Sequence, residues 1–313
     1  MAIDHVAVMR QLAGLRELAA KKVEQDRLPT DLEAARHNRA ELRDLGLEGY
    51  AADLELKGYT VLPPGKVGSP ELCGRLLDTI LRFDAQDRPE AIGEGSPRGR
   101  LLWHLLPRDQ VFEEALMAPE PLALVAYLLG YRAKLGQCTA AIKDSTSTTP
   151  LYFHTDQSRK IPAPWPSDAQ FVTVTWALTD YTRDNGAICV YPGSHKLCAD
   201  VPDANVWMHD DPDVDVIEAP AGSVIIHHGA LWHGAVPRTA DGQRVTLMMP
   251  LVRFHLLPQE MFCLSTTPEM LERNPSRFAA LMGLLGSWPW GADGPDTGYT
   301  RPSWLTAREN RFA

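Results

Sequence analysis

Two histidine–aspartate pairs in the sequence have a spacing that can hold a metal ion. The first is His154 and Asp156 in LYFHTDQSRK, and the second is His209 and Asp211 in MHDDPDVD. The first stretch has the composition of a β-strand, in which residues i and i+2 point to the same side. The second has the acidic, proline-containing composition of a loop, which does not fix two side chains on one face. We therefore predict that His154 and Asp156 are two ligands of a metal site.

A third ligand must come from a distant part of the chain. Two histidines and one carboxylate leave coordination positions open, which is the arrangement of non-haem Fe(II) oxygenases. His233 follows one apolar strand and Arg244 begins the next, where a guanidinium fork can bind the carboxylate of a co-substrate. His227 and His228 are adjacent in a predicted strand, and we interpret them as strand residues. The candidates for the second histidine are His195, His227, His228, His233 and His255.

The helices expected around this site lie mainly in the N-terminal part of the chain. Residues 1–50 are rich in charge and have apolar positions at helical spacing, which predicts a helical extension. A short strand is predicted from Tyr59 to Leu62. A helix follows it, with Ser69 as N-cap and Pro70 at the first helical position. Another helix, APEPLALVAYLLG, is expected to end at Gly130.

From about Ala133 onward, short apolar runs alternate with turns. No helical pattern separates these runs, so the sequence favours a β-sandwich or jelly roll over parallel βαβ units. We expect one catalytic domain with an N-terminal extension (1–50), a β-rich domain with its own helices (51–260) and an irregular or helical C-terminal cover (261–313). The cover contains Trp288 and Trp290, which could form a lid or pack on the core.

Composition excludes several classes of partner. The chain has 313 residues, 44% of them hydrophobic, with a formal charge of −9 and no block of Lys or Arg, which argues against a nucleic-acid surface. No run of about 18 apolar residues predicts a membrane span, and the N-terminus does not have the pattern of a signal peptide. The five cysteines are scattered without a C-x-x-C pair. These features predict a cytoplasmic protein in a reducing compartment.

The order of motifs resembles a known family. His154-x-Asp156 is followed by RDNGAICVYPGSHK, then by PAGSVIIHHGALWHG, and then by Arg244. Over residues 50–255 this order resembles the phytanoyl-CoA dioxygenase family of Fe(II)- and 2-oxoglutarate-dependent oxygenases. The resemblance implies a mainly β fold with flanking helices: a double-stranded β-helix (jelly-roll) core with N-terminal helices packed on one sheet. It also implies that His233 completes the Fe(II) site and that Arg244 binds the 2-oxoglutarate carboxylate.

Further pocket residues follow from strand parity. Gln137 and Lys143 are an even number of residues apart in the strand before the motif, so both are expected to line the pocket, with Lys143 contacting 2-oxoglutarate. Tyr152 is expected to share the face of His154. The inward aromatic residue common in the family is displaced by one position here, so Thr175 rather than Trp176 is expected to face the co-substrate.

Two further positions bear on the chemistry. Ala235 occupies a position where the family often has a Ser or Thr that contacts the co-substrate, and we expect it to line the pocket. Asp156 is a carboxylate, whereas halogenases of this superfamily lack one there to make room for halide. The sequence therefore disfavours halogenation.

The function implied by the resemblance is oxidation of a C–H bond, most simply hydroxylation, that consumes O2 and 2-oxoglutarate and releases succinate and CO2. The substrate is expected to be a small molecule, lipophilic or a natural product; no oligomeric state is predicted. Desaturation, epoxidation or ring formation is compatible with the same site. A cupin-type metal isomerase or lyase would not need Arg244, and a non-enzymatic jelly-roll binding protein would not need the metal. Succinate release that requires both Fe(II) and 2-oxoglutarate separates the first hypothesis from these two.

Overall fold

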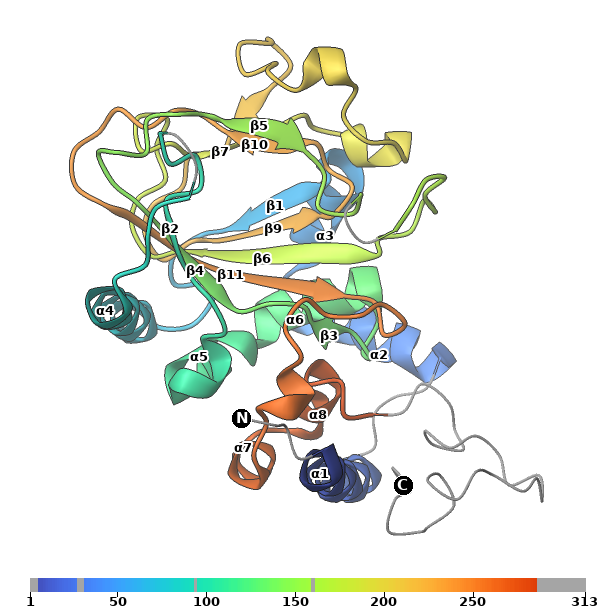
Figure 1. Ribbon diagram of the computed structural model, residues 1–313. Coiled ribbons are helices and arrows are strands. Elements are labelled where there is room, and N and C mark those ends of the chain that lie inside the picture. Colours follow the sequence, from blue (N-terminus) through green and yellow to red (C-terminus); the bar gives the residue numbers. More distant parts are fainter. Residues whose placement is uncertain (1–4, 27–30, 93–94, 159–160, 286–313) are drawn as a thin grey trace.

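Two antiparallel sheets face each other in the computed structural model, which describes residues 5–26, 31–92, 95–158 and 161–285 (Figure 1). The larger sheet consists, in spatial order, of β1 (Tyr59–Leu62), β9 (Val224–His228), β6 (Phe171–Ala177), β11 (Arg244–Val252), β4 (Thr139–Lys143) and β2 (Arg100–Leu102), and β3 (Lys134–Leu135) also pairs with β11. The smaller sheet consists of β5 (Leu151–His154), β10 (His233–Ala235), β7 (Ile188–Val190) and β8 (Asp215–Val216). The predicted jelly-roll core is confirmed.

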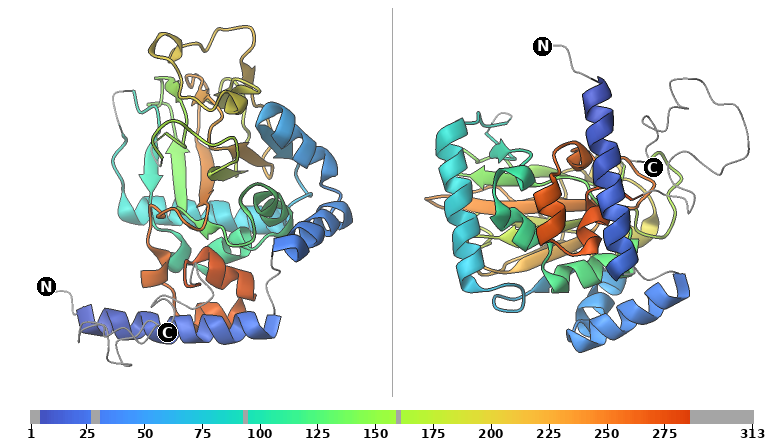
Figure 2. Two further views of the ribbon diagram at one scale, coloured as in Figure 1. Left: turned by 90° about the vertical axis from the view of Figure 1, so that its right-hand side faces the viewer. Right: turned by 90° about the horizontal axis from the view of Figure 1, so that it is seen from below.

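Helices cover the larger sheet on the side away from the smaller sheet (Figures 1 and 2). The described helices are α1 (His5–Asp26), α2 (Asp31–Asp44), α3 (Glu48–Lys57), α4 (Pro70–Asp87), α5 (Gln110–Leu116), α6 (Pro119–Leu129), α7 (Pro268–Arg273) and α8 (Ser276–Leu281). Short 3-10 turns are η1 (Leu106–Arg108), η2 (Ser194–Leu197), η3 (Asp203–Asn205) and η4 (Phe262–Leu264). None of these helices is long and apolar enough to cross a membrane.

The N-terminal helix occupies a different layer from the one expected. Helix α6 packs on β6 and α4 packs on β2, whereas α1 lies outside α7 and α8 and packs on them (Figure 2). The described part of the expected C-terminal cover, residues 261–285, therefore lies between α1 and the rest of the molecule. Trp288 and Trp290 lie outside the described residues.

Strand alternation divides the larger sheet into two faces. Val172, Val174 and Trp176 of β6 belong to the main apolar core that the sheet forms with the helices. Thr173 and Thr175, between them, line a cavity on the opposite face. Successive strand residues point to opposite sides, so one strand supplies both the core and the cavity wall.

Several local signals in the sequence are confirmed. The strand from Tyr59 to Leu62 is β1. The hydroxyl of Ser69 accepts a hydrogen bond from the N–H of Leu72, and Pro70 begins α4. Helix α6 ends at Gly130, whose φ of 83° is one that glycine adopts without a Cβ clash. These signals were reliable because each depends on only a few neighbouring residues.

Candidate metal centre

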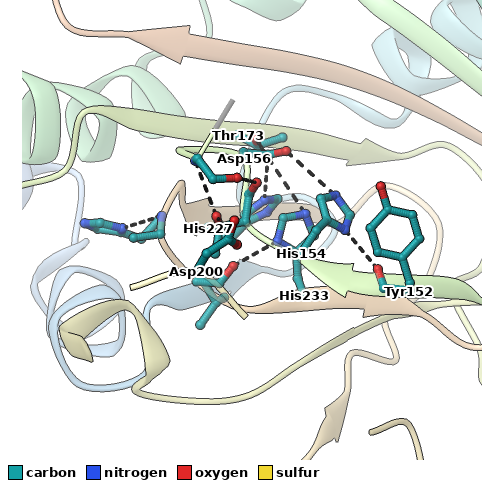
Figure 3. A network of polar contacts seen from close by, with 12 residues as sticks. Tyr152, His154, Asp156, Thr173, Asp200, His227 and His233 are labelled. Atoms are coloured by element: carbon teal, nitrogen blue, oxygen red, sulfur yellow. Dashed lines mark hydrogen bonds and ion pairs between the residues drawn. The ribbon is translucent and has the colours of Figure 1, made fainter. Parts of the chain in front are cut away.

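Three side chains converge at one end of the smaller sheet (Figure 3). His154 is the last residue of β5 and His233 the first of β10, and the two are direct partners across the antiparallel pair. Asp156 lies between the imidazoles: its Oδ1 is 4.0 Å from His154 Nε2 and its Oδ2 is 3.8 Å from His233 Nε2. One ligand atom from each residue lies within 4.8 Å of the other two. This spacing lets all three residues bind a single ion.

Backbone carbonyls fix the orientation of both histidine rings. His154 Nδ1 is 2.9 Å from the carbonyl oxygen of Tyr152, and His233 Nδ1 is 2.9 Å from that of Leu231. A ring that donates its Nδ1 proton to a carbonyl presents the lone pair of Nε2 to the site, the usual arrangement of metal-binding histidines. Burial and the neighbouring His154 also lower the pKa of His233 to about 3, so its imidazole is neutral at pH 7.

Asp156 is held as a carboxylate. Burial opposes its ionisation, but the neighbouring His233 and a hydrogen bond from His227 together keep its pKa well below the usual range. Two histidine imidazoles and one carboxylate are the donor set that a ferrous ion binds with positions left open. The residues present therefore fit Fe(II).

The local geometry of Asp156 differs from the strand alignment that the sequence predicted. Strand β5 ends at His154, and Asp156 lies in the bend that follows. The shared direction of the two side chains therefore comes from this bend and not from strand parity. Parity fails here because the strand is shorter than the apolar pattern suggests.

Tyr152 lies beside the site and not in the cavity wall. Its ring centroid is 5.4 Å from that of His154, its side chain is exposed, and it packs edge-on to Trp207. Pairing between β5 and β10 is irregular, because His233 is opposite His154 while Ala235 is opposite Leu151. Such an irregularity changes which residues face inward. Leu151 lines the cavity in place of Tyr152.

A cavity of about 360 Å³ opens from the triad between the two sheets. Lys143 of β4 and Arg244 of β11, which are direct partners across the larger sheet, lie on its wall. The guanidinium of Arg244 lies 4.5 Å from the ring centroid of Tyr181 and donates a hydrogen bond to the carbonyl of Gly186. Both side chains are buried, and within the described part of the chain Lys143 Nζ and Arg244 Nε have no hydrogen-bond partner. A buried pair of basic side chains with unused donors suits a carboxylate ligand.

The other predicted pocket positions lie on the same wall. Gln137, Thr175 and Ala235 line the cavity, and Gln137 Nε2 donates to Thr139 Oγ1 at 2.6 Å. Trp176 is completely buried in the core on the opposite face of β6. The structure therefore brings together every predicted residue except Tyr152.

Two polar residues next to the triad were missed by sequence reasoning. His227, interpreted as a strand residue, lines the cavity with its Nε2 3.4 Å from Asp156 Oδ2. Thr173 donates from Oγ1 to the same oxygen at 3.0 Å. The adjacency of His227 and His228 carried the signal, because one of two neighbouring strand residues must face inward. His228 faces the other way, with its ring centroid 5.1 Å from that of His195.

Comparison with known proteins places this geometry in a family. The model of the phytanoyl-CoA dioxygenase (PhyH) family matches residues 54–246. "Dioxygenase af480" of Aspergillus fumigatus is 28% identical over 248 residues, which cover 77% of this chain and 78% of that protein. "Dioxygenase FrzG" of a Cladobotryum species is 29% identical over 216 residues, 64% of this chain and 68% of that protein.

Solved structures share the fold. The epimerase SnoN, in complex with Fe3+, alpha ketoglutarate and nogalamycin RO, superposes with a TM-score of 0.56 at 19% identity over 72% of this chain and 91% of that chain. HygX from Streptomyces hygroscopicus, with nickel and 2-oxoglutarate bound, has a TM-score of 0.56 at 18% identity over 67% of this chain and 88% of that chain. The family match covers more than half of the sequence, including His154, Asp156, His233 and Arg244. The chain therefore belongs to the phytanoyl-CoA dioxygenase family of Fe(II)- and 2-oxoglutarate-dependent oxygenases.

Proposed function

We propose that this dioxygenase hydroxylates a C–H bond of a small molecule. His154, Asp156 and His233 would hold Fe(II), and Arg244 would bind the distal carboxylate of 2-oxoglutarate. One observation supports this assignment above the others: the histidine–carboxylate triad and the buried Lys143–Arg244 pair line the same cavity. A cupin-type isomerase or lyase that does not use 2-oxoglutarate would have no use for both, and neither would a metal-free binding protein.

The residues of the chain would bind the metal and 2-oxoglutarate, orient them, and shield them from water. The Nδ1 hydrogen bonds of His154 and His233 hold both Nε2 atoms toward the metal position. When bound, Fe(II) and 2-oxoglutarate supply the oxidising chemistry from O2, with succinate and CO2 as co-products. Arg244 offers the bidentate fork, and Lys143 and Thr175 stand beside it on the same cavity wall. Burial of this wall keeps water away from the reacting groups, which strengthens these charge interactions.

The remaining lining of the cavity suggests the class of substrate. It includes an exposed indole and several apolar side chains, together with two carboxamides. A small lipophilic or natural-product molecule with a few hydrogen-bonding groups suits such a surface. Complexes of similar folds with nogalamycin RO and with hygromycin B support a small-molecule substrate. The lining residues in question are Leu101, Trp103, Gln137, Phe171, Met248, Pro250 and Gln259.

A second outcome at the same site has specific support. Two of the proteins with this fold are an epimerase and a carbocyclase. Epimerisation or ring closure would use the same triad and co-substrate and would differ only in the fate of the substrate after hydrogen removal. The mass of the product distinguishes them, because hydroxylation adds one oxygen atom and neither alternative does.

The test is succinate release measured with Fe(II), ascorbate and 2-oxoglutarate, followed by mass spectrometry of a small-molecule panel. We expect His154→Ala and Asp156→Ala to abolish succinate release. Asp211→Ala, in the other histidine–aspartate pair, is the matched control and should keep it. Full turnover in either triad variant would refute the assignment. Succinate release without an oxygenated product would instead favour the second outcome.

A further inference from the structure

Thr173 and His227 are a cross-strand pair at the centre of the larger sheet. Thr173 of β6 is the direct partner of His227 of β9, so their side chains stand next to each other on the same face. That face lines the cavity, and both residues are buried. The pair therefore presents a hydroxyl and an imidazole side by side toward the smaller sheet (Figure 3).

Both side chains reach the same oxygen atom. Thr173 Oγ1 donates to Asp156 Oδ2 at 3.0 Å, and His227 Nε2 lies 3.4 Å from that oxygen. His227 Nδ1 is buried and has no hydrogen-bond partner within the described residues, so the Nε2 atom is the one that carries the ring's polar contact. A proton on Nε2 makes this contact a hydrogen bond to the carboxylate oxygen.

Asp156 needs such support because its own strand has ended. It lies in the bend after β5, where no strand ladder fixes its direction. A carboxylate oxygen has two lone pairs, and two donors occupy both of those on Oδ2. Among the described residues none donates a hydrogen bond to Oδ1, which lies 4.0 Å from His154 Nε2.

We infer that Thr173 and His227 form a clamp that positions Asp156 for the metal by holding Oδ2 and leaving Oδ1 to coordinate. His227 then acts through Asp156 and is not a fourth ligand, so the centre retains three protein ligands and its open positions. The inference rests on the proposed metal site. It gives the larger sheet, which supplies none of the three proposed ligands, a part in positioning one of them.

Measurement of metal affinity tests the clamp without a need to measure enzymatic turnover. Partners of a metal-binding side chain typically change metal affinity by tenfold to a hundredfold when they are removed. We therefore expect His227→Phe and Thr173→Val each to weaken Mn(II) binding by about tenfold to a hundredfold, measured by electron paramagnetic resonance without 2-oxoglutarate. His227→Gln and Thr173→Ser, which keep a donor, should recover most of the affinity. The double variant should lose less than the sum of the two single losses, because both donors serve one oxygen.

The matched control is His228→Phe, the same substitution at the next residue of β9, whose side chain faces away from Asp156. It should change thermal stability without changing Mn(II) affinity. Unchanged affinity in both His227→Phe and Thr173→Val would overturn the clamp and leave the metal site standing. A loss in His227→Phe that Gln does not recover, with Thr173→Val unaffected, would also overturn it and identify His227 as a ligand. Absence of Mn(II) binding by the unsubstituted protein would refute the metal site itself.

Discussion

Lys143 and Arg244 are direct partners across β4 and β11, so two basic side chains stand together on one wall of the cavity. Burial, followed by the nearby Arg244, lowers the pKa of Lys143 to about 6. The amine is therefore mostly neutral at pH 7.5 until an anion arrives. Of the two side chains, Arg244 is the one that carries its charge permanently.

Binding of 2-oxoglutarate should therefore be coupled to proton uptake. An incoming carboxylate favours the charged form of Lys143 and raises its pKa, so the complex binds a proton that the free protein lacks. We expect uptake of up to about one proton per ligand between pH 7 and 8, measured by calorimetry in buffers of different ionisation enthalpy. Lys143→Met should bind more weakly and without the uptake. Identical proton stoichiometry in both proteins would contradict the role of Lys143.

The lowered pKa of Lys143 should also make the free energy of unfolding depend on pH in the absence of ligand. Between pH 6 and about 10, the unfolded chain binds a proton at Lys143 that the native protein does not, so the contribution of Lys143 makes the free energy of unfolding rise with pH. The penalty is fully present below pH 6 and disappears above the unfolded pKa. Urea unfolding at several pH values should show a shallower rise in Lys143→Met. An equal slope in the two proteins would argue against a buried, neutral lysine.

Arg244→Lys should weaken the binding of 2-oxoglutarate more than it destabilises the fold. The substitution keeps a positive charge but loses the planar fork, and a charged hydrogen bond contributes about 1.5–3 kcal/mol. We expect the KM for 2-oxoglutarate to rise by about tenfold to a hundredfold with a smaller change in kcat. Arg183→Lys, at an exposed position nearby, is the control and should leave KM unchanged. An unaltered KM in Arg244→Lys would show that Arg244 does not bind the carboxylate of 2-oxoglutarate.

Substitutions at two neighbouring residues of β6 should affect different properties, one the stability and the other the binding of 2-oxoglutarate. Trp176 is completely buried in the core, so Trp176→Ala should lower the free energy of unfolding by about 3–5 kcal/mol. Thr175 lines the cavity, so Thr175→Val should change the KM for 2-oxoglutarate and have little effect on unfolding. Should the alanine variant not fold, Trp176→Phe offers a milder test with KM again unchanged. A KM effect at Trp176 and none at Thr175 would reverse the assigned faces.

Glu260 should stabilise the segments that carry the cavity-lining residues Trp103 and Gln137. Its carboxylate accepts the N–H groups of His104 and Cys138, both at 2.8 Å, and its own N–H donates to Gly136 at 2.9 Å. An amide in its place can satisfy only one of the two donors, and an unsatisfied buried group costs about 1–3 kcal/mol. Glu260→Gln should lower the free energy of unfolding by that amount in urea titrations. Glu272→Gln, at an exposed position, is the control.

Much of the fold could be predicted because its signals are local. The cap at Ser69, the end of α6 at Gly130 and the strand at Tyr59 each depend on a few adjacent residues. The position of α1 outside α7 could not be predicted in this way. It depends on which apolar faces remain uncovered once the sheets have formed, and that is a property of the whole chain.

The same distinction between local and long-range signals applies to the site residues. Strand parity was enough to separate Thr175 from Trp176, because both lie within one regular strand. It failed at Tyr152, where the pairing of β5 with β10 is irregular, and at Asp156, which lies beyond the end of β5. His227 was missed because its relation to Asp156 depends on the register between β6 and β9, which no single segment specifies.

The pairing of His154 with His233 also has a consequence during synthesis of the protein. During translation, the segment with His154 and Asp156 emerges from the ribosome well before the segment with His233. A growing chain would therefore carry two of the proposed ligands before the third is available. Contacts between residues so distant in sequence form late because loop closure is costly. Capture of the proposed metal would have to wait until β10 has paired with β5, so metal binding would report that these two strands of the smaller sheet have come together.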